Sequence, residues 1–86
     1  MTGPLRKLAD AFSETAIGDE IVVMSLSSGD FFSLEDTGRA IWLLIDGTRD
    51  EAGVLAALDE QYGGDVDRGE VVHFLTTLRD AGFLAD

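Results

Sequence analysis

The chain has 86 residues, which is enough for one small domain with a single hydrophobic core. It has no cysteine and one histidine, which excludes disulfides and a zinc site built from these residues. Seventeen acidic residues against six basic ones give a formal net charge of −11, which disfavours nucleic acid as a partner and indicates either simple solubility or a basic partner.

The N-terminal residues 1–11 contain no apolar stretch of the kind that a signal peptide needs. The longest apolar runs, residues 21–24 and 40–45, are far shorter than the ~20 residues that span a bilayer. We therefore expect a cytoplasmic protein with no membrane partner. We also expect a flexible arm over residues 1–11 and one folded domain over residues 12–86.

Three strands joined by two tight turns are predicted at the start of this domain. The first covers residues 12–17, where alternation is weak, and the second covers residues 20–26, which are apolar on both alternating sets. Such a run is typical of a central strand that is covered on both faces. Gly18 and Gly29 mark the turns, and residues 31–34 return as the third strand.

The third strand is expected to be an open edge of the sheet. In an antiparallel meander the second strand is central, so residues 31–34 have one unpaired side. Alternation directs Phe32 and Leu34 toward the core and Phe31 and Ser33 away from it. An unpaired edge can bind an extended peptide as an added strand.

The first predicted helix begins with Asp36 as its N-cap and ends before Gly47. Its apolar residues recur at helical spacing and should pack between the hairpin and the other helices. These residues are Ala40, Ile41, Trp42, Leu44 and Ile45.

Two further helices are predicted after it. One begins near Thr48 or Asp50, both of which are candidate caps, and is stopped by Gly63. The last starts after Asp65 or Asp67 and runs to about residue 81. Their apolar stripes are Val54, Leu55, Leu58 and Tyr62 in one, and Val71, Phe74, Leu75 and Leu78 in the other, after which Phe83 and Leu84 return to the core.

The order of elements predicts an α+β fold. An N-terminal three-stranded antiparallel sheet cannot bury its apolar face alone, and three short helices can cover it. The arrangement is related to a winged helix.

No constellation for catalysis is found in the sequence. His73 is the lone imidazole, and no general base accompanies Ser33. There is no glycine-rich phosphate loop and no metal-ligand spacing. We therefore expect no enzyme activity, no cofactor and no metal.

Two stretches carry a resemblance to a known family. They are DFFSLEDTGRAIWLLIDG over residues 30–47 and EVVHFLTTLRDAGFL over residues 70–84. In order along the chain they resemble the PqqD-like family of RiPP precursor-peptide recognition domains, in their stand-alone form. The matching residues are Phe31, Phe32, Leu34, Thr37, Gly38, Ile41, Trp42, Asp46, Gly47, Glu70, Val71, Phe74, Leu75, Leu78 and Gly82.

The resemblance implies a function in peptide binding. Such domains bind the leader region of a ribosomally made precursor as a strand added to the hairpin sheet, packed against the third helix. They present the precursor to a maturation enzyme, which is a radical-SAM protein in pyrroloquinoline quinone and similar pathways or a leader peptidase in lasso-peptide pathways.

A candidate leader-peptide site follows from this resemblance and from helical spacing. The third strand offers its edge, and one row of the third helix forms the facing wall, with Glu70 and His73 nearer the rim. The candidate residues are Asp30, Phe31, Phe32, Ser33, Leu34, Glu70, Val72, His73, Leu75, Thr76 and Arg79.

Two other functions stay open at this point. The chain could be a regulatory subunit that binds a folded partner through the same edge or its acidic surface. Nucleic-acid binding through a winged helix is disfavoured, because the third helix combines acidic residues with only two arginines. The sequence is compatible with a monomer or a weak homodimer.

Overall fold

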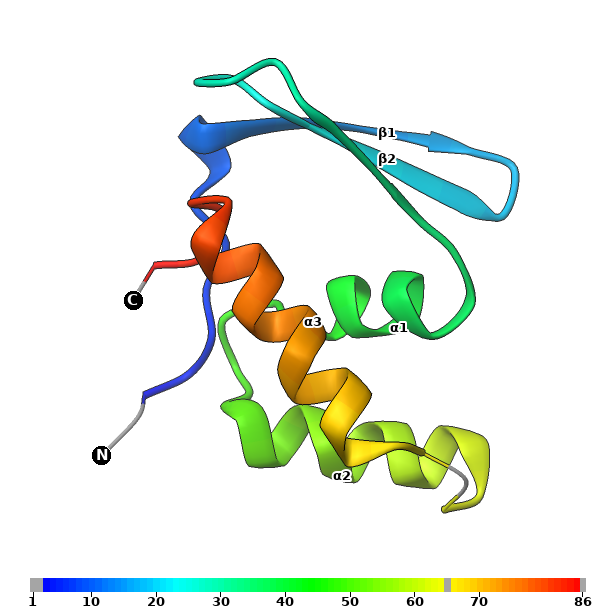
Figure 1. Cartoon of the computed structure of the whole chain (residues 1–86). Helices are drawn as coiled ribbons and strands as arrows, with labels where there is room; N and C mark the ends of the chain where they lie inside the picture. The colour runs from blue at the N-terminus through cyan, green and yellow to red at the C-terminus, as the bar shows by residue number, and fades with distance from the viewer. Residues whose placement is uncertain (1–2, 65, 86) are drawn as a thin grey trace.

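The predicted order of three strands and three helices is confirmed by the structure, a computed structural model that describes residues 3–64 and 66–85 (Figure 1). The fold is α+β, with an N-terminal antiparallel sheet followed by three helices. The elements are η1 (Ala9–Ala11), β1 (Phe12–Ile17), β2 (Glu20–Ser25), β3 (Phe31–Leu34), α1 (Asp36–Leu44), α2 (Glu51–Tyr62) and α3 (Arg68–Asp80).

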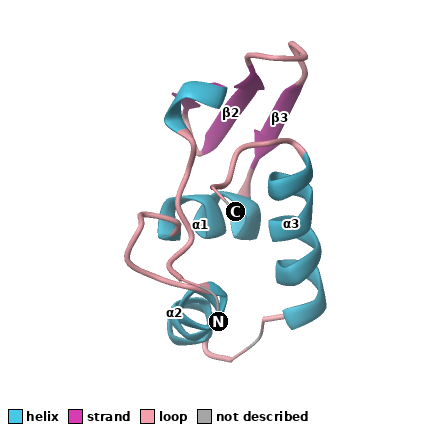
Figure 2. Ribbon diagram, turned by 90° about the vertical axis from the view of Figure 1, so that its left-hand side faces the viewer, coloured by secondary structure: helices cyan, strands magenta, loops and turns pink. Residues whose placement is uncertain are grey.

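The sheet is a meander with the order β1-β2-β3, so β2 is central and β3 forms one edge. The two-residue turn between β1 and β2 contains Gly18 at a φ of 60°, a conformation that favours glycine. The sheet lies across one end of the helices, with α1 beneath it, α3 to one side and α2 at the base (Figure 2).

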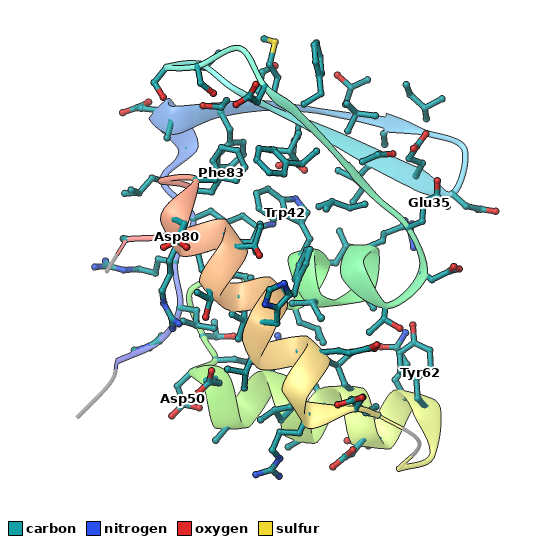
Figure 3. All side chains as sticks on the ribbon, viewed as in Figure 1. Glu35, Trp42, Asp50, Tyr62, Asp80 and Phe83 are labelled. Carbon is teal, nitrogen blue, oxygen red and sulfur yellow. The ribbon has the colours of Figure 1, made fainter. Side chains whose placement is uncertain are left out.

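One hydrophobic core joins the sheet to the helices. Ile21 and Val23 of β2 are buried and point toward the helices, where Trp42 of α1 is fully buried. Phe83, which follows α3, is also fully buried and closes the core from the C-terminal side. Trp42 and Phe83 lie directly under the sheet in Figure 3. The expected packing of Trp42 between hairpin and helices is confirmed.

The predicted boundaries of α1 are wrong at both ends. Asp36 is not the N-cap: it is the first helical residue, at a φ of 50°, and Glu35 takes the cap position without a side-chain hydrogen bond. The helix ends at Leu44 because Ile45 leaves helical geometry while its side chain stays buried. Asp46 then accepts a hydrogen bond from the Thr48 N–H at 3.0 Å, an Asx turn that competes with a further helical turn.

The caps of α2 and α3 resolve the two predicted alternatives. Asp50, and not Thr48, caps α2: its carboxylate accepts the Gly53 N–H at 2.8 Å. Asp67 caps α3 through the Glu70 N–H at 3.3 Å, while Asp65 lies outside the described residues. Gly63 ends α2 at a φ of 68°, as predicted.

The described part of the N-terminal arm, residues 3–11, packs on the core. Leu5 is 4% exposed, and its N–H donates to the Arg49 carbonyl at 2.7 Å. Lys7 pairs with Leu84 in an isolated bridge, and its ammonium lies 4.2 Å from the centroid of the Trp42 ring. These contacts differ from the loose attachment that we expected. The division into an arm over 1–11 and a domain over 12–86 stays a prediction.

Candidate functional site

The hydrogen-bond pattern of β3 identifies which backbone groups face the open edge. The Ser25 N–H donates to the Asp30 carbonyl at 2.8 Å, so these two residues form a hydrogen-bonded pair. Pairs alternate along an antiparallel ladder, and the register pairs Phe32 with Val23. Phe32 therefore bonds to β2, whereas the N–H and C=O groups of Phe31 and Ser33 point away from it.

The side chains of β3 anchor this edge to the core. Leu34 is buried, and the ring of Phe32 packs against Phe83 with centroids 5.2 Å apart, in an edge-to-face arrangement. The inward direction predicted for both β3 side chains is confirmed. Phe83 continues the cluster to Phe12 at 5.5 Å. The edge of β3 is thus supported from below by packed aromatic rings.

Trp42 ties the opposite edge of the sheet to the same cluster. Its indole N–H donates to the Glu14 carboxylate of β1 at 2.9 Å, and its ring contacts Phe12 at 5.1 Å. Burial lowers the pKa of Lys7, which lies over this ring, and the nearby Glu14 and Asp46 carboxylates oppose that shift. Both edges of the sheet are therefore fixed relative to α1.

A groove lies between α1 and α3, from the first turn of α1 along α3. It consists of two hollows, of about 170 Å³ and about 540 Å³, that share Glu70 and Phe74 as walls. The smaller is completed by Thr37, Gly38 and Ile41, and the larger by Asp67, Gly69, His73 and Thr77.

Gly38 of α1 and Phe74 of α3 both line the smaller hollow of this groove. A Cβ at position 38 would lie 3.6 Å from the Phe74 ring, in ordinary van der Waals contact. The missing side chain of Gly38 therefore leaves the smaller hollow open beside the half-buried ring. Ile41 and Phe74 contribute apolar lining to this hollow, and Glu70 is its acidic residue.

The structure brings only part of the predicted site together. Glu70 and His73 line the groove, and Phe74, which we expected to face inward, is half-buried and forms a wall. Leu75 is 0% exposed, so its part in peptide binding stays a prediction that its burial does not favour. Because a helix turns about 100° per residue, Leu75 shares the core-facing stripe of Val71, and Phe74 flanks that stripe.

Three predicted residues of α3, Val72, Thr76 and Arg79, lie on the other flank of the helix. Their helical positions place them on the side of the core stripe opposite to Phe74 and Glu70. Their part in peptide binding stays a prediction that the position of the groove does not favour. The sequence signal that could have found the groove is Gly38, because a glycine inside a helix leaves room for a neighbouring ring.

The charges around the edge are of one sign. Between Lys7 and Arg39 the chain has seven acidic residues and no basic one, and this stretch contains the whole sheet. Two of the acids, Asp30 and Glu35, directly precede and follow β3. Glu70 and Asp67 add carboxylates to the groove. A ligand that carries basic residues is therefore attracted to this side of the molecule.

Within the described part of the chain, no group of three acidic, histidine or cysteine residues could hold a metal ion. Across the same residues, every helix is too short or too polar to cross a membrane.

Together, the fold and the site define a small α+β domain that offers an open strand edge and an adjoining groove to an extended ligand. The sequence model of the family described as Coenzyme PQQ synthesis protein D (PqqD) matches residues 20–84. The chain belongs to this family, and the resemblance seen in its sequence is confirmed.

A solved structure supports the same relationship. It is described as "TbiB1 in Complex with the TbiA(beta) Leader Peptide" and shares 31% sequence identity with this chain. The similarity covers 93% of this chain and 99% of that one, with a TM-score of 0.74. A comparison with curated proteins gives no match.

Proposed function

We propose that this protein binds the leader region of a ribosomally synthesised precursor peptide and presents the precursor to a separate maturation enzyme. The leader adds to the sheet as a strand beside β3. The observation that carries the proposal is the open edge of β3 next to the groove of Phe74. Membership of the PqqD family supports it, as does similarity to a protein whose structure holds a leader peptide.

The main chain supplies affinity in this mode of binding. Phe31 and Ser33 offer two N–H donors and two carbonyl acceptors to an added strand. Each such hydrogen bond contributes about 0.5–1.5 kcal/mol net. Alternate side chains of the leader then face the groove, where an apolar anchor fits beside Phe74 and Gly38.

The proposed role is binding without catalysis. The chemistry belongs to the partner enzyme, which is a radical-SAM protein or a leader peptidase according to the pathway. We place this function in the cytoplasm, where precursor peptides are made. The acidic surface around β3 favours a leader or an enzyme with basic residues.

A proline at position 33 tests strand addition directly. The Ser33 N–H points to the open edge, so Ser33→Pro removes a donor to the leader without breaking a bond to β2. Ala16→Pro is the matched control: Ala16 pairs with Ile21 at a non-hydrogen-bonded position, so its N–H points outward at the β1 edge.

Binding is measured by titrating labelled leader peptide, from the precursor encoded beside this gene, with each variant. We expect Ser33→Pro to weaken binding about two- to tenfold, through the loss of one main-chain hydrogen bond, and Ala16→Pro to leave it unchanged, with similar melting temperatures for both. Equal affinities of the two variants would refute strand addition at β3.

A further inference from the structure

The face of the sheet that points away from the helices carries an apolar surface. Ile17 is 58% exposed and Phe31 is 69% exposed, and the half-buried Val22 and Met24 lie between them on the same side of the pleat. Met24 is paired with Phe31 at a non-hydrogen-bonded position, where side chains approach closely. We call these four residues the outer face.

No described segment covers the outer face. The three helices lie on the opposite side of the sheet, with α1 beneath it and α2 farthest from it, as Figures 1 and 2 show. Side chains stand out from the sheet on the side away from the helices in Figure 3. Leu26, which directly follows β2, extends the exposed apolar surface at 56% exposure. A contiguous apolar surface of this kind on a small domain marks an interaction site.

The charges around the outer face indicate the chemistry of its occupant. Glu20 begins β2, and Asp30 directly precedes β3. Glu20 also accepts a hydrogen bond from the Ser33 hydroxyl on this face. Because every charged residue from position 8 to position 38 is acidic, a second copy of the chain would meet its own sign of charge. A matching partner combines an apolar centre with a rim of lysine or arginine.

The outer face is also continuous with the leader edge. Phe31 directs its main-chain groups toward the proposed leader and its side chain onto the outer face. A protein seated on the outer face therefore lies next to a leader bound at β3. That position suits an enzyme that must receive the precursor as the precursor leaves the groove.

We propose that the outer face is the docking surface for the maturation enzyme, which contacts it through an apolar patch ringed by basic side chains. This inference rests on the proposed leader-binding function. It predicts a ternary complex in which the leader occupies the β3 edge while the enzyme covers the outer face. The two binding events use different atoms, so substitutions can separate them.

The test uses the double variant Ile17→Thr/Met24→Gln, which removes apolar area from the outer face and leaves the main chain of β3 untouched. Leu43→Gln is the matched control, because Leu43 is 52% exposed but belongs to α1 on the other side of the sheet. Each protein is saturated with leader peptide and titrated with the maturation enzyme encoded in the same gene cluster.

The proposal predicts that the double variant loses at least tenfold in affinity for the enzyme, with leader affinity unchanged. The control should bind both as the unaltered chain does. Unchanged enzyme affinity of the double variant would overturn the docking surface while leaving leader binding intact. Analytical ultracentrifugation provides a second measure. If the unaltered chain forms a dimer and the double variant is a monomer, the outer face binds a second copy of the chain instead of the enzyme. If the unaltered chain does not bind the leader peptide, the proposed function itself is refuted.

Discussion

Two neighbouring residues of α3, Phe74 and Leu75, separate binding from stability. Leu75 is 0% exposed and lies among core residues, so Leu75→Ala leaves a cavity and should cost about 2–5 kcal/mol of folding free energy. For a domain of this size about 1 kcal/mol corresponds to about 4–8 °C, so Tm should fall by about 8–40 °C. Leader affinity of the folded fraction should not change.

Phe74→Ala should have the opposite profile. The Phe74 ring is half-buried and walls both hollows of the groove, so its removal takes away an apolar contact for the leader. That contact is worth about 1–2 kcal/mol, or roughly tenfold in Kd. Its effect on Tm should be smaller than that of Leu75→Ala, because part of the ring is already in water.

Unfolding by urea or heat is followed through the fluorescence of Trp42, the one tryptophan of the chain, which is fully buried. Leader binding is titrated at low temperature and corrected for the folded fraction. The reasoning is refuted if Leu75→Ala weakens leader binding tenfold with little change in Tm, or if Phe74→Ala binds the leader normally.

Two further predictions concern α1 and the N-terminal arm. Gly38→Ala should raise Tm, because alanine is favoured over glycine by about 0.8–1 kcal/mol inside a helix. It should also weaken leader binding, because its methyl group narrows the smaller hollow. A thermal melt checks the rise in Tm, and a leader titration checks the loss of affinity. Burial lowers the pKa of Lys7 below 10.5, so the folded chain releases this proton at a lower pH than the unfolded chain does. The free energy of unfolding should therefore rise with pH between the lowered pKa and 10.5. Urea titrations over this pH range should show the rise in the unaltered chain and not in Lys7→Met. The same dependence on pH in both proteins would contradict the prediction.

The strands could be predicted closely from the sequence because their signals are local. Alternation and the turn glycines Gly18 and Gly29 placed all three within one residue. The C-terminal end of α1 could not be predicted, since Ile45 and Asp46 continue the helical pattern of the sequence. In the structure the helix stops because Ile45 is buried outside helical geometry and Asp46 forms an Asx turn. The burial of Ile45 is a tertiary constraint, which local propensity does not contain, and the Asx turn at Asp46 is a local alternative that competes with the helix.

The candidate site was predicted on the strand and only partly on the helix. Spacing in β3 identifies inward and outward side chains, and the structure agrees at Phe32 and Leu34. On α3, helical spacing gives one broad apolar stripe that contains both Phe74 and Leu75. Because these residues are adjacent in the sequence, the spacing does not determine which of the two lies at the centre of the stripe and which at its edge. The rotation of α3 buries Val71, Leu75 and Leu78 in the shared core and leaves Phe74 beside Gly38 of α1, a residue 36 positions earlier in the chain. A contact between residues so distant in sequence is not visible in helical periodicity.

The acidity of the sheet has a consequence for the specificity of its open edge. An exposed edge strand pairs readily with a second copy of itself. If two β3 strands paired antiparallel through their outward-facing main-chain groups, with Phe31 of each copy opposite Ser33 of the other, Asp30 of each copy would lie next to Glu35 of the other at the ends of the strand. Like charges at adjacent positions across a strand pair repel each other.

A leader strand with lysine or arginine at the same two positions would replace both repulsions with attractions. The two carboxylates therefore act on self-pairing and on peptide binding with opposite signs. We therefore expect the charge that opposes pairing between two copies to favour a basic leader at the same edge.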